Sequence, residues 1–200
     1  MVSIKALVSL ALIAAGLPSL ARAADWQATE KIDYYTVSGS SGAELYAAIG
    51  EHGPKVALGT SAIAHTNFVL TWTRKYEVQG NDCAIVTAKP KLIITYTLPR
   101  APKKLPAAVQ ANWDAFAAGV HKHELVHGEM IKDMVGKIQA TSLGLRVEND
   151  RACKKIRTEL TGRLGELSKS QRQQSRDFDQ VELTEGGNVH QLILKLVNGP

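Results

Sequence analysis

The sequence predicts an α+β fold, in which a small antiparallel sheet with one short helix is followed by two long packed helices that carry an HExxH motif. A change in periodicity leads to this prediction. Alternating apolar and polar residues, typical of half-buried strands, dominate residues 24–104. Apolar residues spaced three and four apart, typical of helices, dominate residues 105–180. Residues 181–200 are less regular, and we expect them to form a tail.

The mainly β part contains three predicted strands and one helix. Residues 31–39 are rich in β-branched and aromatic residues and predict a strand, and residues 43–50 suit a short helix. Residues 67–78 and 83–98 alternate between apolar and polar side chains, and the polar turn QGND joins them into a predicted hairpin. Because proline has no backbone N–H, Pro90 predicts a sheet edge or a bulge at that point.

The mainly helical part follows a proline-containing linker at residues 99–106. The first helix is expected from Ala107 to about Gly144, and the second over residues 149–177, with a thinner apolar face. The first helix has one continuous stripe of side chains with helical spacing, made of Val109, Trp113, Phe116, Val120, His123, His127, Ile131, Met134 and Ile138.

The N-terminus has the features of a secretory signal peptide. Residues 1–23 combine a positive charge at Lys5, an apolar run, and small residues at Ala21 and Ala23. We expect cleavage after Ala23 and a periplasmic or secreted mature protein, which leaves a single domain over residues 24–200. A membrane anchor is the less favoured alternative, because the apolar run is shorter than the roughly 20 residues that a span needs.

Composition excludes several classes of protein. The 200 residues include 44% hydrophobic and 22% charged residues, as in globular proteins, which argues against disorder and coiled coil. The formal net charge is +5, and two of these charges, Lys5 and Arg22, are removed with the signal peptide. Since no cluster of basic residues remains, we expect no nucleic-acid partner.

The chain has two cysteines, Cys83 and Cys153. An even number of cysteines in an exported chain predicts one disulfide. The alternatives are two free thiols or a cysteine metal site, but no CxxC spacing supports the latter.

The motif His123-Glu124-x-x-His127 has the spacing that a zinc site on a helix requires. Histidines four residues apart lie one turn apart on one face, where both rings can bind one Zn²⁺ at about 2.1 Å. Both histidines also lie on the predicted apolar stripe, where an unpartnered polar group costs about 1–3 kcal/mol. Glu124 is the predicted general base, which takes a proton from water as the water attacks a carbonyl.

A catalytic zinc site needs a third protein ligand, and the sequence leaves its identity open. Asp133 has the spacing of an extended HExxH motif, but on an uninterrupted helix it points away from the histidines. Acids on or after the second helix, Glu159, Glu166 and Asp179, are the alternatives. We favour Asp179, because Asp177-Phe178-Asp179 interrupts a polar helix where the chain could fold back.

Four other histidines have no neighbouring ligand pattern. His121 lies two positions before His123, nearly opposite on the helix, so we expect it to be solvated. His52, His65 and His190 are expected at the surface.

The mature chain resembles a bacterial family of secreted zinc-dependent proteases that is catalogued as a domain of unknown function. The resemblance depends on Tyr34 to Gly39, Gly42 to Leu45, Gly53-Pro54, Cys83, Thr97 to Arg100, Trp113-Asp114, the HExxH motif and Cys153. It implies a zincin-like metallopeptidase with His123 and His127 as ligands and Glu124 as the base. The chain departs from the family after Phe178-Asp179, where the family pattern Thr-x-His-Gly is replaced by Thr184-Glu185-Gly186-Gly187.

We therefore expect a Zn²⁺-dependent peptidase that acts on a peptide or protein substrate, with no stable membrane insertion after the signal is removed. Two alternatives come from other classes. The first is a non-catalytic metal-binding protein that uses His121, His123 and His127. The second is an envelope binding protein in which the motif is vestigial. The departure at residues 184–187 keeps both alternatives open.

Overall fold

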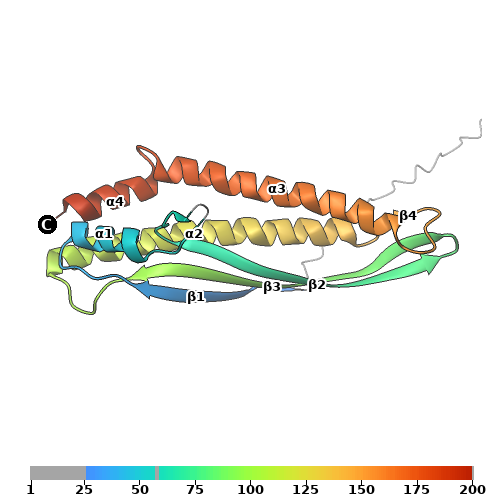
Figure 1. Cartoon of the computed structure of the whole chain (residues 1–200), viewed down its shortest axis with the longest axis horizontal. Coiled ribbons are helices and arrows are strands. Elements are labelled where there is room, and N and C mark those ends of the chain that lie inside the picture. Colours follow the sequence, from blue (N-terminus) through green and yellow to red (C-terminus); the bar gives the residue numbers. More distant parts are fainter. Residues whose placement is uncertain (1–25, 57–58, 200) are drawn as a thin grey trace, which may run out of the picture.

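The structure, a computed structural model, describes residues 26–56 and 59–199, so the predicted signal peptide lies outside the described residues. The molecule is elongated and has three layers (Figure 1). A twisted sheet forms the first layer, the long helix α2 (Ala107–Ser142) lies on it, and helices α3 (Lys155–Leu183) and α4 (Asn188–Asn198) cover α2. The predicted α+β class is confirmed.

The sheet is mixed rather than purely antiparallel. The predicted hairpin is present, with β2 (His65–Gln79) antiparallel to β3 (Asp82–Arg100). Strand β1 (Thr29–Thr36) instead pairs in parallel with the second half of β3. Between β1 and β2 the chain reverses through helix α1 (Gly42–His52), so β2 starts at the end of the sheet where β1 finishes. The turn of the hairpin then reverses the chain, so that β3 lies between β1 and β2 and runs in the same direction as β1.

Pro90 lies where β3 has one neighbouring strand among the described residues. It pairs with Trp72 of β2, whereas β1 reaches only to Ile93 and the two-residue strand β4 (Arg146–Val147) pairs near the start of β3. The prediction of a local sheet edge at Pro90 is confirmed. The bulge in the hairpin lies a few residues away, where the register shifts after Lys75.

The predicted stripe of helix α2 is buried in the core between the sheet and helices α3 and α4, and every member of the stripe is less than a tenth exposed. Helix α2 lies close to β3 at Gly128, directly after the HExxH motif. A Cβ atom there would lie 2.1 Å from the hydroxyl of Tyr96, so only glycine lets the helix pack this close. The motif is therefore held against the sheet.

The residues predicted as a tail form a helix. Gly187 caps α4, and Val189 and Leu196 of α4 are buried in the main core with α1 and α2. Gly42 makes this packing possible, since a Cβ atom there would lie 1.8 Å from the carbonyl oxygen of Leu196. The C-terminal residues therefore form a packed helix rather than a tail.

A disulfide joins Cys83, near the start of β3, to Cys153, just before α3, which confirms that prediction. Both cysteines belong to a second, smaller core with Ile85, Ala88, Ile156 and Leu160. A structural disulfide indicates an oxidising, extracytoplasmic compartment. Among the described helices, none has the length and apolar character needed to cross a bilayer.

Candidate metal centre

Helix α2 brings two imidazole rings together in the interior. His123 and His127 are 8% and 9% exposed, and their Nε2 atoms lie 3.1 Å apart. The rings share a helix face because they are four residues apart, and both lie on the buried stripe of α2. Two nitrogen atoms therefore point at one position between α2 and α3.

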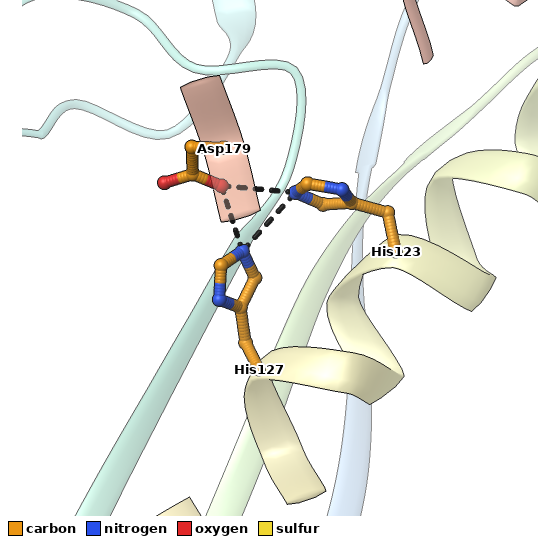
Figure 2. Close-up of side chains that lie close together, drawn as sticks. All are labelled: His123, His127 and Asp179. Atoms are coloured by element: carbon orange, nitrogen blue, oxygen red, sulfur yellow. Dashed lines mark hydrogen bonds and ion pairs between the residues drawn. The ribbon is translucent and has the colours of Figure 1, made fainter. Parts of the chain in front are cut away.

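Asp179 of α3 completes the cluster. Its Oδ1 atom lies 3.1 Å from Nε2 of His123 and 2.9 Å from Nε2 of His127, so three donor atoms from two helices converge (Figure 2). Asp179 is the third ligand that the sequence favours, on the expectation that the chain folds back at residues 177–179. The structure has no break there, because α3 continues to Leu183 and presents Asp179 from antiparallel packing against α2.

The chemistry of this donor set fits a divalent metal ion. Two ligand atoms, each about 2.1 Å from one tetrahedral zinc ion, are about 3.4 Å apart, and the three donors here are separated by 2.9–3.1 Å. His123, His127 and Asp179 form a group that could hold a metal ion. Two histidines and one carboxylate leave a tetrahedral ion with one position for water or substrate.

The electrostatics of the cluster favour positive charge. Burial lowers the pKa of His127, but the hydrogen bond to Asp179 and the negative charges of Asp179 and Glu124 outweigh burial, so its pKa lies above the ordinary value. Burial raises the pKa of Asp179, but hydrogen bonds from His123 and His127 outweigh it, so its pKa lies well below the ordinary value. Asp179 is therefore an ionised, anionic donor.

A second layer of contacts orients the two rings. Nδ1 of His127 lies 3.3 Å from Oγ of Ser175, and that oxygen also accepts a hydrogen bond from Nε2 of Gln171 at 3.0 Å. Because the hydroxyl of Ser175 donates to Sδ of Met130 at 3.8 Å, its oxygen can accept a hydrogen bond from Nδ1–H of His127, and the tautomer with the proton on Nδ1 leaves Nε2 free to bind a metal. His123 is held differently, because Phe178 stacks on its ring at a centroid distance of 4.7 Å.

Replacing Ser175 by Ala is expected to weaken the binding of added Zn²⁺ about tenfold, because His127 loses the partner that orients its ring. The measurement is a competition titration against a chelating dye at fixed pH. Ser170→Ala, which removes an exposed hydroxyl from the same helix, is the matched control and should leave the affinity unchanged. Equal affinities in both variants would mean that Ser175 does not position the ring.

Glu124 lies next to the cluster and is 5% exposed. The hydroxyl of Thr66, near the start of β2, donates a hydrogen bond to Oε2 of Glu124 at 2.5 Å. Glu124, both histidines and Asp179 line one cavity of about 570 Å³, which the segment before β2 borders on the other side. The acid and the cluster therefore open into a common space large enough for part of a peptide.

The other candidate residues lie away from this cluster. The three other acids considered as the third metal ligand form surface ion pairs along their own helices. These pairs are Asp133 with Lys137, Glu159 with Arg163, and Glu166 with Lys169. His121 does not join the cluster and is half-buried, with its ring edge-on to Tyr96 at 6.2 Å, so the prediction that it is solvated holds only in part.

Thr66, Ser175, Gln171 and Phe178 could not be predicted as site residues from the sequence. Thr66, Ser175 and Phe178 each contact the motif across at least 48 residues of chain, and Gln171 contacts Ser175, so no local pattern identifies them. One signal was present for Phe178, since it is an aromatic residue between two acids on an otherwise polar helix.

A family model described as "Bacterial protein of unknown function (DUF922)" matches residues 32–187. This range includes the HExxH motif, Asp179 and both cysteines. Comparisons with curated proteins and with solved structures found no significant match.

Proposed function

The chain belongs to the DUF922 family of bacterial proteins, and from its metal centre we propose that it is a zinc-dependent metallopeptidase of an extracytoplasmic compartment. The proposal depends mainly on one observation. Nε2 of His123, Nε2 of His127 and Oδ1 of Asp179 lie within 3.1 Å of one another, and Glu124 lines the same cavity. A metal site with one position left for water, beside an acid, is the arrangement that hydrolysis of a peptide bond requires.

In this proposal His123, His127 and Asp179 hold the zinc ion. When bound, zinc supplies Lewis-acid chemistry that brings the pKa of water to about 7 and polarises a carbonyl. Ser175 keeps the proton of His127 on Nδ1, so that Nε2 presents its lone pair. Phe178 covers one face of the His123 ring and keeps solvent from it.

Glu124 is the general base and then the general acid. A carboxylate oxygen of Glu124 takes a proton as the water oxygen forms a bond to the carbonyl carbon of the substrate. The same carboxyl group returns that proton to the amide nitrogen as the C–N bond breaks. The hydrogen bond from Thr66 fixes the orientation of this carboxylate, which pre-organises the transfer.

The proposal is tested on the purified mature protein by measuring bound metal with mass spectrometry and by following hydrolysis of a mixture of proteome-derived peptides. We expect about one zinc ion per chain, loss of hydrolysis with a chelator, and recovery when Zn²⁺ is added back. Absence of stoichiometric zinc in freshly isolated protein, or hydrolysis that a chelator does not affect, would contradict it.

A second candidate is metal binding without catalysis. The short hydrogen bond between Thr66 and the buried Glu124 favours it, because that contact can also serve to join β2 to α2. This candidate predicts metal binding with no hydrolysis of any peptide in the mixture. The same experiment therefore separates the two.

A further inference from the structure

A second cavity, of about 550 Å³, also reaches the metal centre. Its walls are α2, α3 and α4, and it shares His123 and Val189 with the first cavity. Phe178, whose ring stacks on His123, lines it as well. A group bound in this cavity therefore lies next to the imidazole of a metal-binding residue.

The cavity combines an apolar lining with a positive rim. Lys122 of α2 and Lys195 of α4 both line it, both are exposed, and neither forms an ion pair within residues 26–56 and 59–199. The one acid in its lining, Glu182, accepts a hydrogen bond from the neutral amide of Asn188 at 2.6 Å and keeps its negative charge. The lining therefore carries two lysines and one carboxylate, a net positive charge, and neither lysine forms an ion pair with that carboxylate.

The apolar part of the lining depends on close packing between α2 and α4. A Cβ atom at Gly119 would lie 2.1 Å from Cδ1 of Leu192, so glycine allows Leu192 to approach α2. Leu192, Val126 and Phe178 together line the cavity with apolar side chains. Such a surface suits the methylene groups of a side chain.

We propose that this cavity is a subsite for an acidic side chain of a peptide substrate. The carboxylate pairs with Lys122 and Lys195, and the methylene groups lie on Phe178 and Leu192. This inference rests on the proposed peptidase function, since it assumes a peptide substrate. Helix α4 forms much of the wall of this cavity. It begins at residue 188, and the match to the family model ends at residue 187.

The test is a binding measurement that does not need turnover. Hexapeptides labelled with fluorescein, with Glu, Gln or Lys placed at each position in turn, are titrated onto zinc-loaded Glu124→Gln protein. We expect Glu peptides at one position to bind at least about tenfold more tightly than Gln peptides, and Lys peptides to bind most weakly. Equal binding of Glu and Gln peptides at every position would overturn the proposal.

Charge reversal then locates the site. Lys122→Glu combined with Lys195→Glu should abolish the preference for Glu, whereas Lys89→Glu with Lys91→Glu, on exposed positions of β3, should keep it. Single Lys122→Gln and Lys195→Gln variants should each reduce the preference, and circular dichroism checks that all variants fold. Retention of the preference in the double reversal would overturn the proposal. Selective binding without hydrolysis by the wild type would contradict the peptidase function and leave the subsite intact.

Discussion

Replacing Glu124 by Gln is expected to lower the rate of peptide hydrolysis by about 10²–10⁴-fold while bound metal stays at the wild-type level. The amide has the size of the carboxylate and still reaches the hydroxyl of Thr66, but it cannot take a proton from water. Since the three candidate metal ligands are unchanged, metal content should not fall. The measurement combines kcat for a peptide found to be cleaved with metal analysis of the same sample.

Glu129→Gln is the matched control. Glu129 is an exposed acid on the same helix, and its ion pair with Lys132 lies at the surface, away from the cavity. The control should retain full activity and metal. If Glu124→Gln kept its activity, Glu124 would not be the base. If it lost metal and activity together, the role of Glu124 would be to hold α2 and β2 in place.

The part of the site that lies on one helix could be predicted from the sequence. His123, Glu124 and His127 are linked by the helical period alone, so their spacing fixes their relative positions before any tertiary contact is known. Asp179 is separated from them by 52 and 56 residues. Its contribution depends on the register between α2 and α3, which sequence periodicity does not define.

The same distinction applies to the fold. The hairpin, the short helix and the buried stripe of α2 follow local alternation or helical spacing, and the structure contains all three. The parallel pairing of β1 with β3 and the packing of α4 on α1 both join segments that are far apart in the chain. Helix α4 has an apolar face, but a helix of 11 residues is stabilised mainly by the surface it packs on, which sequence periodicity does not define.

Removing the disulfide by Cys83→Ala with Cys153→Ala is expected to lower the free energy of unfolding by about 4 kcal/mol. The bond closes a loop of 70 residues, and the entropy that such a loop removes from the unfolded chain accounts for a loss of this size. Urea denaturation of the oxidised wild type and of the double variant measures the difference. The wild type treated with a reducing agent is the control and should match the variant. A loss below about 1 kcal/mol would contradict the prediction.

The effect of this variant should also depend on metal. Helix α3 has 29 residues, but only Ile156, Leu160 and Gln171 are buried, so its own packing holds it weakly. The disulfide fixes the chain just before α3, and Asp179 joins the other end of α3 to α2. In the double variant, a metal bound by His123, His127 and Asp179 becomes the main tether of α3. Adding a chelator should therefore undock α3 in a larger fraction of the double variant than of the wild type, because no disulfide then holds the start of α3 in place. The measurement is amide hydrogen exchange over α3, and equal undocking in the two proteins would mean that the disulfide and the candidate metal centre act independently.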